Sequence, residues 1–226
     1  MPRSHEDEVK PVPLLFDRLR VYLLGMDLVQ EISSCELCVQ RFAATATRHR
    51  PRPVPWFKTG ARILVASQAP GVRVHEAGKP FFDRSGDRLR EWMGVDADTF
   101  YDKRKIAFVP MAFCFPGYDS KGSDLPPPAI CAKTWRQRVM DTLQPDITLL
   151  VGGHAQGWHL GTRGVTDTVR DWQSHAPRYF PLPHPSWRNT GWLKRNPWFE
   201  ADLLPSLREN IARILATYSE TSHDRP

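Results

Sequence analysis

Long apolar runs are missing from this sequence. No hydrophobic segment approaches the roughly 20 residues that span a bilayer. The first ten residues, MPRSHEDEVK, are charged and are followed by no apolar stretch typical of a secretion signal. Internal repeats are absent as well. We therefore expect a soluble intracellular protein with no membrane partner, and 226 residues with 41% hydrophobic content suffice for one well-buried domain.

Cysteine is scarce, and its four positions are unevenly spaced. Cys35 and Cys38 form a C-x2-C pair, whereas Cys114 and Cys131 lie far downstream with sixteen residues between them. Disulfides are disfavoured inside cells, so four thiolates with one close pair suggest zinc or an iron-sulfur cluster. Zinc sites usually use two close pairs, which favours a cluster, although spacing alone does not choose the metal. Four unrelated buried thiols are the alternative.

Net charge is modest, with a formal value of +6 and a pI near 9.3, which suits a polyanionic partner without requiring one. The eight tryptophans are more informative, because basic residues stand beside several of them, as in Trp135-Arg136 and Trp187-Arg188. Aromatic faces next to cations suit unstacked bases and phosphates. Alternatively, most of these tryptophans belong to the core.

Apolar patterning predicts alternating strands and helices. The expected strands are 62–66, 105–110, 146–151 and 178–182, and the expected helices are 11–32, 87–93, 129–143, 154–160 and 199–218, the last broken at Pro205. This order predicts a single α/β domain with a central parallel four-stranded sheet flanked by helices on both faces. We expect the domain to span 11–218, with disordered termini at 1–10 and 219–226.

The loop 66–86 connects the first strand to its helix, at the carboxyl end of a strand where open α/β sheets bind ligands. Pro70 and Gly71 predict a tight turn with exposed backbone N–H groups, and a second bend presents Phe81 and Asp83. An aromatic face, a carboxylate and backbone donors together suit a planar polar ring. An ordinary Gly- and Pro-rich surface loop is the alternative.

Taken together, the motifs resemble a known family. The order C-x2-C, an APG-x(7)-KPF-like motif at Ala69 to Phe81, C-x16-C and a late His184-Pro185-Ser186 is similar to that of the iron-sulfur uracil-DNA glycosylases, families four and five of the uracil-DNA glycosylase superfamily. The resemblance covers Cys35 to Ile214. It implies a DNA repair enzyme that flips uracil, or another deaminated base, out of single- or double-stranded DNA and hydrolyses its N-glycosidic bond. We expect a cytoplasmic, nucleoid-associated monomer.

The resemblance also implies a role for individual residues. The four cysteines, Cys35, Cys38, Cys114 and Cys131, are similar to the ligands of a 4Fe-4S cluster. Phe81 resembles the aromatic that stacks on the flipped uracil, and Gln68, Ala69 and Gly71 belong to the base-binding loop. His184 resembles the histidine that donates to the uracil carbonyl. The following segment resembles the part that enters the duplex, and we place the DNA-contacting residues there: Ser186, Trp187, Arg188, Lys194 and Arg195.

This sequence departs from the family pattern at the catalytic carboxylate. Family four carries a Glu in its first motif, where this chain has Gln68, and an amide cannot take a proton from water. Family five uses an Asp in a D-x-S-G-like segment. Asp83-Arg84-Ser85-Gly86 is similar to that segment, although one residue is missing between the Phe and the Asp. We therefore expect Asp83 to be the catalytic carboxylate.

The sequence leaves several alternatives open. Asp83 could simply cap the helix that begins near Ser85, and His75 or Glu76 could handle the catalytic water instead. The Asn with which family four reads the uracil edge has no counterpart at Val109-Pro110-Met111, so hypoxanthine or xanthine could be the preferred base. A non-catalytic iron-sulfur or zinc protein that binds damaged DNA is the alternative from another functional class.

Overall fold

The computed structural model describes residues 27–162 and 164–223. The predicted disordered segment 1–10 lies outside the described residues, as does most of the helix expected over 11–32. Its residues 27–32 are described and are helical, and the helix continues to residue 33. No helix in these two ranges is long and apolar enough to cross a membrane.

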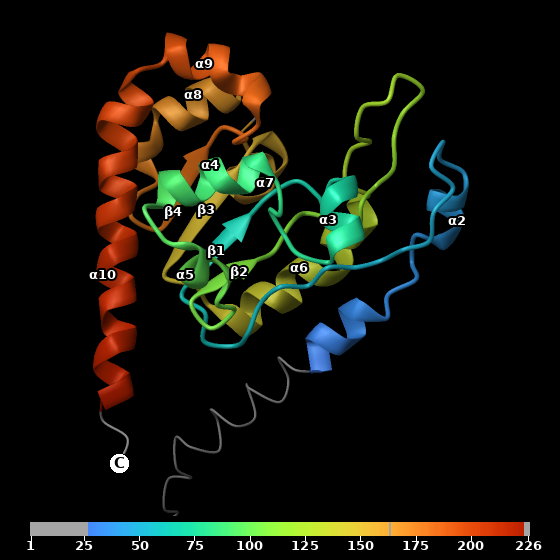
Figure 1. Cartoon of the computed structure of the whole chain (residues 1–226), viewed down its shortest axis with the longest axis horizontal. Coiled ribbons are helices and arrows are strands. Elements are labelled where there is room, and N and C mark those ends of the chain that lie inside the picture. Colours follow the sequence, from blue (N-terminus) through green and yellow to red (C-terminus); the bar gives the residue numbers. More distant parts are fainter. Residues whose placement is uncertain (1–26, 163, 224–226) are drawn as a thin grey trace, which may run out of the picture.

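A parallel four-stranded sheet forms the centre of the molecule, which confirms the predicted fold class (Figure 1). Its strand order is β2-β1-β3-β4. The strands are β1 (Ile63–Ala66), β2 (Ile106–Phe108), β3 (Ile147–Val151) and β4 (Tyr179–Leu182). Pro181 is tolerated within β4 because this strand lies at the edge of the sheet and needs donors on one side only.

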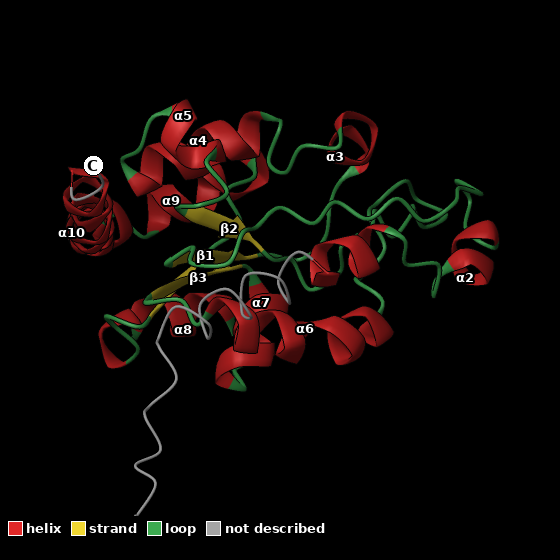
Figure 2. Cartoon of the chain, turned by 90° about the horizontal axis from the view of Figure 1, so that it is seen from below, coloured by secondary structure: helices red, strands yellow, loops and turns green. Residues whose placement is uncertain are grey.

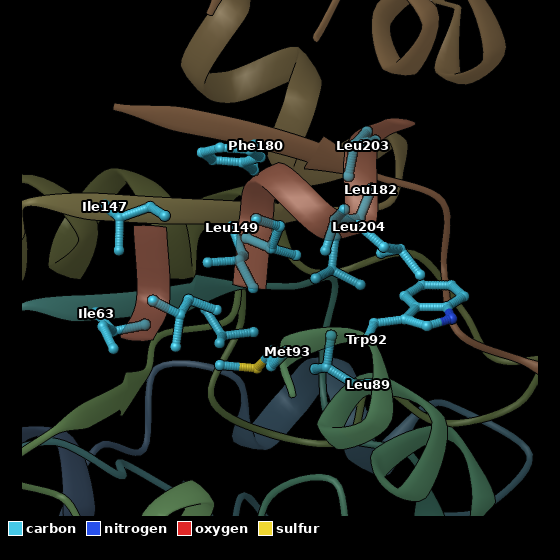
Figure 3. Close-up of a cluster of buried hydrophobic side chains, with 14 of the residues drawn as sticks. Ile63, Leu89, Trp92, Met93, Ile147, Leu149, Phe180, Leu182, Leu203 and Leu204 are labelled. Atoms are coloured by element: carbon cyan, nitrogen blue, oxygen red, sulfur yellow. The ribbon is translucent and has the colours of Figure 1, made fainter. Parts of the chain in front are cut away.

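Side chains of the strands alternate between two apolar cores, one on each face of the sheet. Ile63 and Val65 join the core that α4 (Arg84–Met93) and α10 (Leu204–His223) cover, drawn in Figure 3 with Leu89 and Trp92. Leu64 and Ala66 face the opposite core beneath α6 (Ala129–Leu143). Figure 2 shows the helices on both sides of the sheet. Burial on both faces explains why the strands are mostly apolar.

The longer helices fall where apolar periodicity predicts them. These are α4, α6, α10 and α7 (Gly153–Leu160). The structure adds short elements that the sequence pattern does not predict: α2 (Val39–Ala43), α3 (Val72–Ala77), α5 (Ala97–Tyr101), α8 (Val165–Arg170), α9 (Thr190–Arg195), η1 (Trp172–Ser174) and η2 (Trp187–Asn189). Each of these spans too few residues for an apolar period to be recognised.

The predicted break of the last helix at Pro205 is wrong. A π-helical stretch, η3 (Phe199–Leu203), leads directly into α10. Pro205 follows directly on this π-helical stretch, an irregularity in the helical hydrogen-bond pattern of the kind that accompanies kinks without ending the helix. Because α10 runs to His223, the expected domain end at 218 lies within this helix.

The strand order creates a crevice at the carboxyl ends of the strands. The chain passes from β1 to β2 on one side of β1, and then crosses to β3 on the other side. Connections that diverge in this way leave an opening at the carboxyl ends of the strands, where α/β proteins bind ligands.

Candidate active-site cleft

A cleft of about 930 Å³ lies at the carboxyl ends of the strands. The connections after β1, β2 and β4 all contribute to it. Among its lining residues are the sequence-predicted Gln68, Ala69, Gly71, Phe81, Asp83, His184, Ser186, Trp187 and Arg188. Residues from distant parts of the chain therefore meet in one site.

Two loops form the floor of the cleft. The backbone N–H of Met111 donates to the Ser67 carbonyl at 2.8 Å, and the N–H of Ala112 donates to the Gln68 carbonyl at 3.1 Å. These bonds continue the pairing of β1 with β2 beyond the strands. Pro110 and Gln68 both line the cleft, so the floor consists of backbone held in a fixed position, one amide side chain and a proline.

Phe81 lies in the wall of the cleft with a left-handed backbone, at φ 52°. Its ring centroid is 5.5 Å from that of Phe108, and its carbonyl accepts a hydrogen bond from the Tyr101 hydroxyl at 3.1 Å. A positive φ is unfavourable for a side chain of this size and persists only where surrounding contacts enforce it. The structure therefore fixes this aromatic ring at the cleft.

Gly86 permits this arrangement. A Cβ added at Gly86 would lie 1.8 Å from the Phe81 carbonyl oxygen, so the first turn of α4 packs directly on the Phe81 backbone. We expect Gly86→Ala to displace Phe81 and to lower the free energy of unfolding by about 1–3 kcal/mol, as overpacked sites do. Denaturant unfolding measures this loss. Gly71→Ala, where an added Cβ meets nothing within 4 Å, is the control and should be nearly neutral.

Asp83 has two structural roles: it is the N-cap of α4, and it lines the cleft. Its Oδ1 accepts hydrogen bonds from the backbone N–H groups of Ser85 at 2.9 Å and Gly86 at 3.0 Å. The capping alternative considered from the sequence is thus realised. It does not exclude a chemical role, because the cap holds the carboxylate in a fixed position at the cleft wall.

His184 also lines the cleft and belongs to the loop after β4. The backbone N–H of Ser186 donates to its Nδ1 at 3.2 Å, and the Asn189 side chain donates to its carbonyl at 2.7 Å. Burial lowers the pKa of His184, and the charge of Asp83 partly opposes this shift. The ring is therefore neutral near pH 7. Since Nδ1 accepts, the proton is on Nε2, which makes that nitrogen a hydrogen-bond donor.

The structure places the alternative water-handling residues away from the cleft lining. His75 and Glu76 both lie on α3, and neither contributes to the cleft. The His75 ring packs against those of His49 and Phe115, with centroids 5.4 Å and 5.9 Å apart. Burial is the main cause that lowers the pKa of His75. Glu76 is exposed to solvent.

Asp124 is a second carboxylate in the cleft, and sequence reasoning missed it. It belongs to the segment between β2 and α6, which folds back on itself through a bridge between Tyr118 and Asp124. Figure 1 shows this yellow-green segment projecting beyond α3. Burial raises the pKa of Asp124, and Arg188 opposes the shift. The charge of Arg188 thus acts on Asp124, whereas the charge of Asp83 acts on His184.

The DNA-contacting candidates extend from the mouth of the cleft onto α9. The Trp187 side chain is 69% exposed, and the Arg188 guanidinium lies 5.8 Å from the centroid of its ring. Ser186 caps the turn η2 by accepting from the Arg188 N–H at 3.3 Å. Lys194 and Arg195 are exposed in the last turn of α9. An exposed aromatic and three cations therefore follow His184 closely along the chain.

All four cysteines line one other cavity, together with apolar side chains only. The remaining lining residues are Ile32, Leu37, Phe42, Pro51, Pro53, Ala112, Phe113, Pro128 and Trp135. The pKa of Cys114 is raised to about 12 and that of Cys131 to about 11, mainly by burial and in smaller part by the neighbouring thiols. In the described ranges, no group of three or more His, Cys, Asp or Glu side chains is arranged to hold a metal ion.

Fold and cleft together define an α/β protein that holds an aromatic ring, a carboxylate and a neutral histidine around one ligand site. The model of the uracil DNA glycosylase superfamily matches residues 54–208. Because this match covers more than half of the chain, the protein belongs to that superfamily. Membership supports DNA glycosylase activity, DNA as the substrate and a role in DNA repair.

Proposed function

We propose that this protein is a DNA glycosylase that flips uracil, or another deaminated base, into the cleft and hydrolyses its N-glycosidic bond, leaving an abasic site. The observation that carries the proposal is that Phe81, Asp83 and His184 line the same cleft. A base inside a duplex is unreachable, so the enzyme must extrude it. Extrusion costs roughly a few kcal/mol of free energy, which stacking and hydrogen bonds to the edge of the base must offset.

Each of these three residues has a distinct role in the proposed reaction. The ring of Phe81 stacks on the flipped base. The Nε2–H of His184 donates to a carbonyl oxygen of the base, where negative charge develops as the bond to the sugar breaks. Asp83 supplies negative charge beside the oxocarbenium-like sugar and accepts a proton from the attacking water.

Alkaline strand cleavage tests the proposal. The protein is incubated with an oligonucleotide that contains one uracil, and alkali then breaks the strand at any abasic site. Cleavage supports a glycosylase, and its absence across uracil, hypoxanthine and xanthine, in single-stranded and duplex DNA, supports a protein that only binds damaged DNA. Pro110 offers no side-chain amide to read the uracil edge, so the sequence does not define the preferred base. The same panel of substrates determines which deaminated base is preferred.

We further propose that the four cysteines hold a 4Fe-4S cluster, as in the iron-sulfur families of the superfamily. The donor set fits such a group, because four thiols surround one cavity whose other walls are apolar. The cluster would link the segment that carries Cys35 and Cys38 to Cys114 and to Cys131 on α6. Its role would thus be structural.

The surface after His184 is the proposed contact with the DNA backbone. Substituting Lys194 or Arg195 with Ala removes a positive charge and should weaken binding. The slope of log Kd against log salt should fall by about 0.9 for each phosphate that the variant no longer contacts on duplex DNA. Fluorescence anisotropy at several salt concentrations measures both quantities. Lys58→Ala is the matched control, because Lys58 is exposed and precedes β1, on the side of the amino ends of the strands, away from the cleft at their carboxyl ends. Unchanged affinity and slope in both α9 variants would place the contact surface elsewhere.

A further inference from the structure

Arg136 is a charged side chain in the interior of the protein that the proposed reaction does not use. It belongs to α6 and is 2% exposed. Its Nη1 donates to the carbonyl oxygen of Val109 at 2.6 Å and to that of Pro110 at 3.4 Å. Its Nε and Nη2 lie 3.1 Å and 2.6 Å from the Nε2 of His159 on α7. The guanidinium is thus satisfied by neutral acceptors.

No carboxylate pairs with this cation in residues 27–162 and 164–223. Burial lowers the pKa of Arg136 to about 10, so it stays protonated at neutral pH. Burial, together with the charge of Arg136, lowers the pKa of His159 to about 3, which leaves a neutral ring whose Nε2 accepts. A buried cation without a counter-ion is costly, and such a group calls for an explanation.

The position of this cation suggests the explanation. The segment that it grips is the floor of the cleft, because Pro110 lines the cleft and Met111 and Ala112 pair with the first loop. Two carbonyl oxygens are bound by the guanidinium and are therefore not presented to the ligand. Free carbonyl oxygens at this floor would repel an anion, whereas a buried positive charge behind them attracts one.

We propose that Arg136 is a positioning residue that prepares the floor of the cleft for a base leaving as an anion. The inference rests on the proposed glycosylase function and deepens it. In that reaction the bond between C1′ and the base nitrogen breaks, and its electron pair stays on the base. The water oxygen bonds to C1′, one water proton passes to Asp83, and the released base anion takes a proton from solvent. Arg136 acts on the charge of the leaving base through the Val109 and Pro110 carbonyls.

The dependence on leaving group tests this role. Fluorine at position 5 withdraws electrons, so 5-fluorouracil leaves as a more stable anion than uracil and needs less help from the protein. Single-turnover excision of both bases is measured from otherwise identical oligonucleotides. We expect Arg136→Met to slow uracil excision by about a hundredfold and 5-fluorouracil excision by about tenfold, smaller than or similar to the loss of a direct donor. The ratio of the 5-fluorouracil rate to the uracil rate should therefore rise about tenfold.

Matched variants separate charge from packing. Arg136→Lys keeps the positive charge and should hold the ratio within about threefold of the parent, whereas Arg136→Gln, which is neutral but can still donate to one carbonyl, should behave like Arg136→Met. A ratio equal to that of the parent in both neutral variants would overturn the inference and leave Arg136 a structural role only. A parent that excises neither base overturns the proposed function, and the inference with it.

A measurement on the unchanged protein covers the case in which neutral variants do not fold. Free 5-fluorouracil should inhibit excision more strongly as the pH rises through its ionisation, because the anionic form is attracted to the floor of the cleft. Inhibition by the neutral form that equals inhibition by the anion would overturn the inference.

Discussion

Replacing Asp83 with Asn should lower the single-turnover rate of base excision by about a hundred- to a thousandfold, the usual cost of removing one well-placed electrostatic contact. The substitution changes little else. Asn is as good an N-cap as Asp, so its side-chain oxygen can still accept from the Ser85 and Gly86 N–H groups that Asp83 binds. Helix α4 and the wall of the cleft therefore stay in place, and only the charge is lost. DNA affinity, measured separately, should change little.

Further variants separate the two roles of Asp83. Asp83→Ala removes both cap and charge and should lower the free energy of unfolding by about 0.5–2 kcal/mol in addition to the loss of rate. Asp124→Asn is the matched control for a carboxylate in the same cleft, and it should affect the rate less because the charge that acts on His184 is that of Asp83, whereas Asp124 is influenced by Arg188. His75→Ala and Glu76→Gln alter residues outside the cleft lining. Near-parent excision by Asp83→Asn, together with an inactive variant at one of those three positions, would show that the assignment is wrong.

The strands are predictable because the sheet is buried on both faces. A strand such as β3 must be largely apolar, since Ile147 and Leu149 face one core and Leu150 faces the other, and only Thr148 interrupts its apolar run. Such a run is visible in the sequence without any knowledge of its neighbours. The short helices are not predictable for the opposite reason. Helix α3 lies between Gly71 and Gly78, and its six residues bury only Val74, which is too little to produce a recognisable apolar face.

The candidate site divides in the same way. Phe81, Asp83 and His184 stand in short motifs whose order along the chain carries a resemblance, so the sequence alone suffices to name them. Asp124 and Arg136 carry no such signal. Asp124 reaches the cleft because its segment folds back through the bridge with Tyr118, and Arg136 meets Val109 across 27 positions of sequence. Contacts of that kind depend on the tertiary fold, and residue type alone indicates only that a buried Arg needs partners.

The segment that carries the first two cysteines has little packing of its own. Helix α2 buries only Phe42, and Cys38, Phe42 and Cys114 form a small apolar cluster separate from the two main cores. A small cluster contributes little stability unless a further link holds it together. Four thiolates bound to one cofactor would provide that link, and the binding free energy of a structural metal site is also folding free energy.

Freshly purified protein should therefore be yellow-brown, with broad absorption near about 400 nm that is typical of iron-sulfur clusters. Cys114→Ala should lose this colour and much of its solubility, because one ligand is removed from the group that ties α2 to the rest of the fold. Leu37→Ala is the control: this side chain lines the same cavity but is 57% exposed and offers no ligand, so its colour should persist. Absorption spectra and iron and zinc analysis decide between the metals. Colourless parent protein with one zinc per chain would contradict the cluster. A structural cluster outside the cleft affects excision only through the fold. If Cys114→Ala stays soluble and brown but no longer excises the base, the cluster does not have a purely structural role.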